Sequence, residues 1–563
     1  MDKKLYMEWL SKLPEHDPLR EELLSIGHQP DEIRDRFYKE ISFGTAGLRG
    51  RRGAGTNRMN VLTVGRAIQG IANYIVNTGV PKGRGVVIAF DCRHFSGEFA
   101  KLAAEILAGN GIKVYLFPSM RSTPELSFTI RSFAAAAGIN MTASHNPPEY
   151  NGCKVYWEDG AQISGEISDG IQKEIGALHY FDRFKKMPLK AAVEERIVRI
   201  LGDEIDLAFL DYVMSMRQRG DEELDLTIPV VYTPLYGAGS IPMQWLAKEL
   251  GYTNFIIVPQ QRDPDPDFTT VGDPNPENPQ AFRLAEEIGR EQGADVLIAT
   301  DPDSDRMAVE VADGEGGYIQ LNGNQTGALL IAYMAQSMQE KGTLPEKAAM
   351  IKSIVTGDMG KAICESYGIR VFETLTGFKN ICALIPRIEE MGYEYFFAYE
   401  ESIGCAPSDI VRDKDGITAS MLVMEMAAWC RRRGTTVGQY LDSLYQKYGY
   451  YAEEQVSLVL DGEAGEKTIS RIMDTFRKDS PASFGSARVE SRIDLIDGCR
   501  DLPASNVLIY RLESGSWFAM RPSGTEPKIK FYYYTRADDG KKAEDRVEEM
   551  KSAVGKMVRS LIV

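Results

Sequence analysis

The sequence has few of the features that mark membrane, secreted or disulfide-bonded proteins. No segment approaches the roughly 20 apolar residues that a membrane-spanning helix needs. The leading residues, MDKKLYMEWLSKLPEHD, contain no apolar core of signal-peptide length. The seven cysteines are scattered without a CxxC pair, which is typical of reduced core thiols and not of a disulfide frame or a zinc site. We therefore expect a cytoplasmic protein with no membrane partner.

Positive charge is scarce relative to negative charge. The chain has 65 Lys and Arg against 81 Asp and Glu, a net charge of -16. A nucleic-acid binder needs clustered Lys and Arg, which a strongly acidic surface opposes, so we expect no nucleic-acid partner. A small anionic substrate is compatible with this charge if basic side chains gather at one site.

The chain is too long for a single hydrophobic core. It has 563 residues, whereas cores stop growing near roughly 250 to 300 residues. Its composition, 43% hydrophobic and 26% charged, is that of a folded globular protein. We predict an α/β protein of four domains, at residues 1–203, 204–320, 321–450 and 451–563.

Strand and helix patterns alternate through the first three domains, after a polar helical lead-in around residues 31–41, and indicate layered α/β structure. The predicted strands are 86–91 and 114–118, then 228–234, 255–260 and the run from 296, then 351–356 and the run from 395. Several lead directly into polar loops, and ligands in open α/β sheets gather at the carboxyl ends of strands. Beyond residue 450, longer strands and a charged terminal helix predict a smaller α+β domain.

The first polar loop, 142–147, contains Ser144 and His145. A serine hydroxyl is a poor nucleophile until a base, a metal or a preorganised acceptor activates it. A structural role for Ser144 in a turn with Asn146 and Pro147 is the alternative.

The second loop, 301–306, alternates three carboxylates, Asp301, Asp303 and Asp305. Hard oxygen ligands at this density favour Mg²⁺ or Ca²⁺. An EF-hand is excluded because the sixth position is Arg306 instead of Gly and the twelfth is Ala312 instead of Glu. A solvated acidic turn is the alternative, although three like charges repel unless a cation neutralises them.

Two more loops carry polar clusters. Glu400, Glu401 and Ser402 end an apolar strand, where they are suited to hydrogen-bonding vicinal sugar hydroxyls or to acid and base work. In the loop from Arg521 to Lys528, an Arg fork, two hydroxyls and the amides near a Gly are suited to a phosphate dianion. Exposed surface charge and a plain β-turn are the respective alternatives.

Together and in this order, TASHNP (142–147), DPDSDR (301–306), YEES (399–402) and RPSGTEP (521–527) resemble the serine, metal, sugar and phosphate loops of the α-D-phosphohexomutase superfamily. FGTAGLRG (43–50), NGCK (151–154) and TGFKN (376–380) are similar to minor signatures of that family. The resemblance spans essentially the whole chain. It implies four domains around a central cleft, the first three sharing one mixed-sheet α/β topology.

The resemblance also implies roles for residues. The implied catalytic residues are Ser144, His145, Arg49, Lys154 and Lys379. The implied substrate-binding residues are Glu400, Ser402, Arg521, Ser523, Gly524, Thr525, Lys528 and Arg306. The implied metal ligands are Ser144, Asp301, Asp303 and Asp305. The expected cofactors are one Mg²⁺ per subunit and glucose 1,6-bisphosphate as intermediate and activator, and the expected assembly is a monomer or weak dimer.

The implied activity is a phosphoglucomutase that works through phosphorylated Ser144. Departures from the family pattern leave the sugar open: Tyr399 stands where the sugar loop usually begins with Gly, and the serine loop continues as PPEYNGCKVYW. Phosphopentomutase, phosphomannomutase and glucose 1,6-bisphosphate synthase are alternatives. A hydrolase with a nucleophilic aspartate and a non-catalytic sugar-phosphate sensor are alternatives of other classes.

Overall fold

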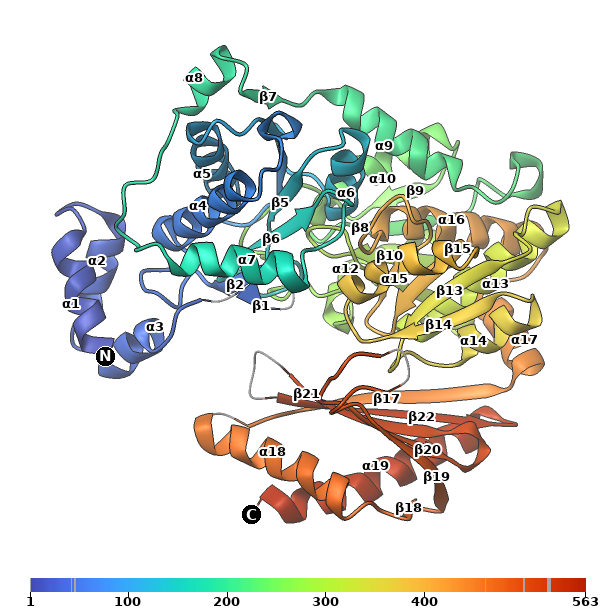
Figure 1. Cartoon of the computed structure of the whole chain (residues 1–563). Helices are drawn as coiled ribbons and strands as arrows, with labels where there is room; N and C mark the ends of the chain where they lie inside the picture. Colours follow the sequence, from blue (N-terminus) through green and yellow to red (C-terminus); the bar gives the residue numbers. More distant parts are fainter. Residues whose placement is uncertain are drawn as a thin grey trace.

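The computed structural model describes residues 2–41, 43–44, 47–460, 462–499, 502–523 and 528–562. Within these ranges, four β-sheets follow one another along the chain, with helices packed against them (Figure 1). This confirms the predicted α/β fold of three α/β domains and a fourth domain on an antiparallel sheet. The predicted domain limits at 203, 320 and 450 stay predictions. No helix in the described ranges has the length and apolar character needed to cross a membrane.

Three helices precede the first sheet: α1 (Asp2–Lys12), α2 (Pro18–Ser25) and α3 (Pro30–Phe37). Trp9 is buried in their core, and its ring packs edge-on against Phe37 and Phe181 and at a tilt against Tyr180. Since Tyr180 and Phe181 belong to the part of the chain that forms the first sheet, the helical unit is docked on the first domain. The sequence predicted only the last of these helices.

The first sheet has seven strands in the order β1-β2-β6-β5-β3-β4-β7. Their bounds are β1 (Phe43–Gly44), β2 (Gly47–Arg51), β3 (Val86–Phe90), β4 (Val114–Leu116), β5 (Ala137–Met141), β6 (Tyr150–Trp157) and β7 (Val198–Ile200). The helices of this domain are α4 (Val61–Asn77), α5 (Ser96–Gly109), α6 (Thr123–Ser132), α7 (Gly165–Gly176) and α8 (Leu189–Glu194).

The second sheet has five strands in the order β12-β11-β10-β8-β9. Its elements are α9 (Asp203–Ser215), β8 (Val230–Thr233), α10 (Ser240–Glu249), β9 (Phe255–Ile257), α11 (Pro259–Arg262), α12 (Arg283–Gln292), β10 (Val296–Thr300), β11 (Met307–Ala312) and β12 (Tyr318–Leu321). β9 is shorter than the predicted strand 255–260 because Pro259 begins a helix, and proline fits the first helical position well.

The third sheet has four strands in the order β14-β13-β15-β16. Its elements are α13 (Gly323–Lys341), β13 (Ala348–Ser353), α14 (Met359–Ser366), β14 (Arg370–Thr374), α15 (Phe378–Glu390), β15 (Glu394–Glu400), β16 (Gly404–Ala406), α16 (Gly416–Arg432) and α17 (Val437–Tyr448). Buried side chains of this domain and of the second, including those of α13 and α16, form one continuous hydrophobic cluster.

The first three sheets repeat one arrangement. The strands β4-β3-β5-β6, β9-β8-β10-β11 and β14-β13-β15-β16 have the same order, with three parallel strands followed by an antiparallel fourth. This confirms the shared mixed-sheet topology that the family resemblance implied.

The fourth sheet is antiparallel, in the order β17-β22-β21-β20-β19-β18. Its elements are β17 (Tyr450–Val459), α18 (Gly462–Lys478), β18 (Ser483–Phe484), β19 (Ala487–Asp494), β20 (Leu508–Leu512), β21 (Trp517–Pro522), β22 (Lys528–Ala537) and α19 (Gly540–Ile562). The sheet has its own hydrophobic core beneath α18 and α19 and lies below the third sheet in Figure 1.

Candidate active site

The polar loops of the first three domains occupy equivalent places in the repeated topology. Each joins the third strand of the shared order to the antiparallel strand that follows: 142–149 joins β5 to β6, 301–306 joins β10 to β11, and 401–403 joins β15 to β16. Hydrogen bonds link the first loop to the second and the second to the third, at Asp301 and at Arg306. The loops that the sequence singled out therefore meet in space.

Ser144 has its backbone in the left-handed region, at φ 52°. A side chain with a Cβ adopts this conformation at a cost of roughly 1 to 3 kcal/mol, so the loop must hold it there. The Ser144 N–H donates to Thr142 Oγ1 at 2.8 Å. The Ser144 Oγ donates to Asp301 Oδ2 at 2.6 Å and lies 3.2 Å from His145 Nδ1. The predicted nucleophile and a predicted metal ligand are thus in direct contact.

Arg93 supports the serine loop through hydrogen bonds to its backbone. No sequence motif had pointed to Arg93. Its guanidinium donates to four backbone carbonyls of the serine loop and its flank, those of Ser144 (2.5 Å), Asn146, Pro147 (2.8 Å) and Tyr150 (3.3 Å). Asp91, at the end of β3, pairs with Arg93 at 3.2 Å. The signal in the sequence was weak: Asp91 and Arg93 follow a buried strand, as many unrelated polar residues do.

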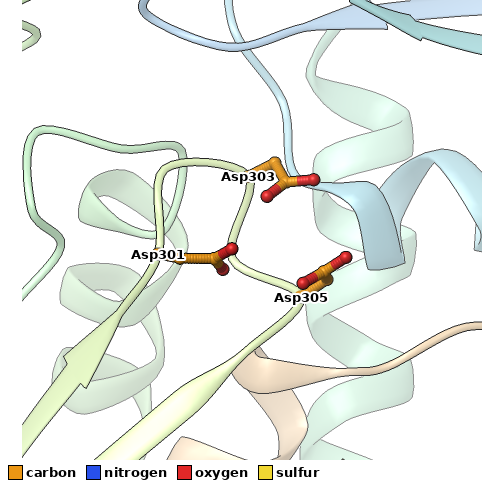
Figure 2. Close-up of side chains that lie close together, drawn as sticks. All are labelled: Asp301, Asp303 and Asp305. Atoms are coloured by element: carbon orange, nitrogen blue, oxygen red, sulfur yellow. The ribbon is translucent and has the colours of Figure 1, made fainter. Parts of the chain in front are cut away.

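The three aspartates converge (Figure 2). Asp301, Asp303 and Asp305 are at most 1% exposed, and each offers an oxygen within 4.8 Å of the others. Burial, and then the charges of the other two carboxylates, raise the pKa of Asp301 well above its ordinary value. Such a group of buried like charges favours binding of a cation.

The unpartnered atoms of the triad suit a hard divalent cation. In the described part of the chain, Oδ1 of Asp303 and Oδ1 of Asp305 are buried without a hydrogen-bond partner. Their Oδ2 atoms accept from Lys154 Nζ, at 2.6 and 2.9 Å. The two unpartnered oxygens lie beside the carboxylate of Asp301. Buried carboxylate oxygens of this kind are the ligands that Mg²⁺ prefers.

Two lysines from different domains neutralise part of this charge. Lys154, on β6, is 3% exposed, and Lys414 lies 3.1 Å from Asp305 Oδ2 and 3.0 Å from Asp413 Oδ1. Burial lowers the pKa of Lys154, but Asp303 and Asp305 outweigh it and hold that pKa above its ordinary value. Lys154 is therefore a charged group at rest. No sequence motif had assigned a role to Lys414.

Arg49, Arg306 and His145 surround the same loops. Arg49, on β2, donates to Asn146 Oδ1 at 2.8 Å. The Arg306 N–H donates to Asp301 Oδ1 at 3.0 Å, and its side chain donates to the Ser402 carbonyl at 3.4 Å. Burial, followed by the charges of Arg306 and Arg49, lowers the pKa of His145 well below its ordinary value. His145 is neutral, and its ring can accept a proton only against neighbouring positive charge.

The third polar loop, Glu400 to Ile403, lies at the end of β15, and we name it the carboxylate loop. Glu400 Oε1 accepts from the Gly377 N–H at 2.6 Å, and burial, then Glu401, raises the pKa of Glu400 to about 7. Glu401 Oε2 lies 3.2 Å from both the Ser353 and Thr356 hydroxyls. Lys379, in the first turn of α15, has its pKa lowered by burial. The loop and the segment that carries Lys379 are joined through Glu400.

The fourth polar loop, which begins at Arg521 and ends at Lys528, lies between β21 and β22 in the chain. Arg521 donates to Thr376 Oγ1 in the third domain, and its Nε is buried without a hydrogen-bond partner among the described residues. Ser523 and Lys528 are described at the ends of the strands, while Gly524 and Thr525 lie outside the described residues. The structure therefore places Arg521 against the segment before Lys379, next to the carboxylate loop.

Lys530 adds a cation that the sequence analysis did not single out. It pairs directly with Arg521 across β21 and β22, so the two side chains share a face. Like charges directly opposite one another destabilise a sheet. Burial lowers the pKa of Lys530, and Arg521 and Lys528 lower it further against Glu401. A bound anion would relieve this repulsion.

Comparison with known proteins agrees with the fold. Three family models match: phosphoglucomutase/phosphomannomutase alpha/beta/alpha domain I at residues 40–180, domain II at 208–315 and domain III at 322–448. Together they cover more than half of the chain. The chain belongs to the phosphoglucomutase/phosphomannomutase family, within the α-D-phosphohexomutase superfamily. It is an enzyme, an isomerase that acts by phosphoryl transfer.

Similar proteins cover the chain almost from end to end. A phosphoglucomutase of Staphylococcus haemolyticus is 35% identical over 517 residues, covering 89% of this chain and 92% of the relative. One from Staphylococcus aureus strain MRSA252 is 34% identical over 534 residues, covering 92% and 94%.

Two solved structures share the fold. One is a phosphoglucomutase/phosphomannomutase family protein of Burkholderia thailandensis, with a TM-score of 0.67 and 19% identity over 92% of this chain and 98% of that one. The other is the Paramecium phosphoprotein parafusin, a phosphoglucomutase in an open form, with a TM-score of 0.69 and 18% identity over 93% and 94%.

Proposed function

We propose that the protein is a phosphoglucomutase that interconverts glucose 1-phosphate and glucose 6-phosphate through phosphorylated Ser144 and a 1,6-bisphosphate. One observation carries the proposal: Ser144 Oγ lies 2.6 Å from Asp301 Oδ2, within a buried acidic triad. The staphylococcal relatives named phosphoglucomutase support glucose as the sugar.

One Mg²⁺ per subunit would be held by Asp301, Asp303, Asp305 and an oxygen on Ser144. When bound, it would neutralise the charge that develops on the transferring phosphoryl group. The unpartnered Oδ1 atoms of Asp303 and Asp305 support this assignment.

Basic side chains of the first two domains would bind the oxygens of the group in transfer. Arg49 and Lys154 approach from the first domain and Arg306 from the second. Lys154 and Arg306 hydrogen-bond to the acidic triad, and Arg49 hydrogen-bonds to Asn146 of the serine loop. Fixed positive charge in a site that excludes water stabilises developing negative charge strongly. Lys154, Lys379 and His145 were the candidates for the general base, and the raised pKa of Lys154 favours Lys379 or His145.

The substrate would be gripped at both ends. Glu400 and Ser402 would hydrogen-bond ring hydroxyls, while Arg521, Ser523, Gly524, Thr525 and Lys528 would hold the phosphate that is not reacting, joined by Lys530. In the first half-reaction the bond from Ser144 Oγ to phosphorus breaks, the substrate's 6-hydroxyl oxygen gains the phosphoryl group, and the hydroxyl proton passes by way of the general base to Ser144 Oγ. The glucose 1,6-bisphosphate must then turn over, so that its 1-phosphate faces Ser144 and returns a phosphoryl group to Oγ.

We further propose that the domains extend over 1–203, 204–320, 321–450 and 451–563, and that the protein is a cytoplasmic monomer or weak dimer acting on a small phosphosugar. All seven cysteines are free, and five are buried. Free thiols in this number support a reducing compartment.

The test is intact-mass analysis with site mapping of protein purified with Mg²⁺, followed by turnover of glucose 1-phosphate. We expect phosphate on Ser144 and loss of turnover in Ser144→Ala. The matched control is Ser337→Ala, which removes a buried hydroxyl of α13 without a partner among the described residues. An active Ser144→Ala enzyme would refute the mechanism. Faster turnover of ribose 1-phosphate or mannose 1-phosphate would refute glucose as the preferred sugar.

A further inference from the structure

A single turn of the third domain contacts both the carboxylate loop and the fourth domain. Residues 353–358 connect the end of β13 to α14, at the side of the third sheet that faces the fourth sheet (Figure 1). None of the predicted site residues lies in this turn, and no family signature in the sequence includes it. We name it the coupling turn.

On one side, the coupling turn binds the carboxylate loop. The hydroxyls of Ser353 and Thr356 each donate to Glu401 Oε2 at 3.2 Å. Both residues are fully buried. The Tyr399 hydroxyl also donates to the Gly357 carbonyl at 3.3 Å. The turn is thus bonded to the residues on either side of Glu400.

On the other side, Asp358 binds the fourth domain. Its Oδ2 accepts from the Trp517 indole Nε1 at 3.0 Å and lies 3.4 Å from Arg511 NH1. Its backbone N–H donates to the Tyr534 hydroxyl at 2.8 Å. Its Oδ1 accepts from the buried Lys352 Nζ at 2.7 Å, which holds the carboxylate in place. The side chain of Asp358 therefore joins β13 to strands β20 and β21, and its backbone N–H adds β22.

Apolar side chains also pack between the coupling turn and the fourth domain, and we name this contact region the joint. Ile354 and Val355 are buried in a cluster with Trp517 and Tyr534. The rings of Trp517 and Tyr534 are stacked, with centroids 5.1 Å apart and planes at 18°. Close-packed aromatic surfaces transmit a displacement instead of absorbing it, because protein interiors have few voids.

Strands β21 and β22, which contact the coupling turn, also carry the proposed phosphate-binding side chains Arg521 and Lys530. In the register of β21 and β22, Trp517 pairs with Tyr534 and Arg521 with Lys530. Positions four residues apart on a strand share a face and lie about 13 Å apart. The face held by Asp358 at one end therefore presents Arg521 and Lys530 at the other, beside the carboxylate loop.

We propose that Asp358 is a positioning residue, which fixes the angle at which the phosphate-binding face of the fourth domain meets the carboxylate loop. The two ends of one substrate are held by these two parts, so their relative placement sets how well the substrate fits. The inference rests on the proposed function, because it assigns substrate phosphate to Arg521 and Lys530.

The test compares Asp358→Ala and Trp517→Phe with Asp494→Ala. Asp494 pairs with Arg477 at 2.9 Å inside the fourth domain, so this control breaks a half-buried ion pair away from the joint. We expect Asp358→Ala to raise the KM for glucose 1-phosphate about tenfold with kcat within about threefold, the pattern of lost uniform binding. Trp517→Phe keeps an aromatic ring, although a smaller one, and loses the N–H donor while the other contacts of Asp358 remain, so it should raise KM less. The double variant should not exceed Asp358→Ala.

A second measurement tests the contact between the third and fourth domains independently of catalysis. Small-angle X-ray scattering without substrate should give a larger radius of gyration for Asp358→Ala than for the wild type and for Asp494→Ala. Wild-type protein that fails to turn over glucose 1-phosphate would refute the proposed function, and the scattering comparison would then decide the joint alone. A lower melting temperature with wild-type KM and wild-type scattering would overturn the proposal. If Asp358→Ala does not fold, Trp517→Phe decides by the same criteria.

Discussion

Ser144 and Asp301 are 157 residues apart in sequence, yet the Ser144 hydroxyl donates to Asp301 Oδ2 at 2.6 Å. The serine follows β5 and the aspartate follows β10, which are the third strands of the order that the sheets share. Thr123 fixes the same contact between domains, because its N–H donates to the Asp303 carbonyl at 2.8 Å and its hydroxyl donates to Asp303 Oδ2 at 2.7 Å. The nucleophile and the acidic triad are thus assembled by docking two copies of one topology.

The acidic triad predicts that Mg²⁺ stabilises the folded protein. A cation removes the repulsion among three buried carboxylates, and a ligand at about 100 times its dissociation constant contributes about 2.7 kcal/mol to the free energy of unfolding. We expect the melting temperature to rise on titration with Mg²⁺ in the wild type and to respond far less in Asp303→Asn. Asp313→Asn, at an exposed turn of the same domain, should respond like the wild type. An unchanged Mg²⁺ response in Asp303→Asn would argue against the triad as the binding site.

Arg93→Lys should lower kcat without removing the phosphoryl acceptor. A lysine cannot reach four carbonyls with the planar fork of an arginine, so the strained backbone of Ser144 would lose its support. Because a displacement of about 1 Å can cost about 100-fold in rate, we expect kcat to fall roughly 10- to 100-fold.

Steady-state kinetics would be compared with Arg84→Lys, a change at a partly exposed arginine that also donates to two backbone carbonyls of the first domain. If both variants retain wild-type kcat, the carbonyl contacts of Arg93 do not position the nucleophile.

The four loops were predictable because each is a short contiguous segment with unusual composition. Three carboxylates at alternate positions, as in 301–306, are recognisable without any knowledge of the fold. Repetition of one strand order in three domains, and the meeting of their loops, could only be inferred from the family resemblance, since periodicity gives strands but not their order.

The residues missed were those whose partners lie far away in sequence. Arg93 acts on backbone carbonyls, which leave no trace in composition. Lys530 became a candidate only when the register of β21 and β22 placed it opposite Arg521. The first two N-terminal helices were missed because their apolar residues, Trp9 among them, form a core only by packing across helices and onto the first domain.

The cationic pair on β21 and β22 predicts a defect in substrate binding. A hydrogen bond to a charged group contributes about 1.5 to 3 kcal/mol, and about 1.4 kcal/mol is a factor of ten. Arg521→Gln and Lys530→Met should each raise the KM for glucose 1-phosphate roughly 10- to 100-fold. Lys542→Met, an exposed lysine of the same domain, serves as the charge control. Initial rates over a range of substrate concentrations would decide, and a wild-type KM in Lys530→Met would remove it from the site.

We predict that the stability of the folded protein depends on pH through Glu310, a residue outside the active site. This residue of β11 is 3% exposed, and its Oε2 is buried without a partner in the described part of the chain. Burial, and then the charge of Glu286, raises the pKa of Glu310 from 4.5 to about 8 against the opposing charge of Arg290. The carboxyl is therefore held protonated in the folded protein at neutral pH.

Below about pH 4.5 Glu310 is protonated in both states, whereas between pH 4.5 and 8 the unfolded chain has lost a proton that the folded protein keeps. The folded state binds more protons in that window, so this group's contribution to the free energy of unfolding falls as pH rises and is lost above pH 8. Glu310→Gln, which is neutral at every pH, should make the protein more stable relative to the wild type at pH 8 than at pH 5. Urea unfolding of both proteins at the two pH values measures this difference, with the exposed Glu291→Gln as control. A difference that does not change with pH would mean that Glu310 titrates alike in both states.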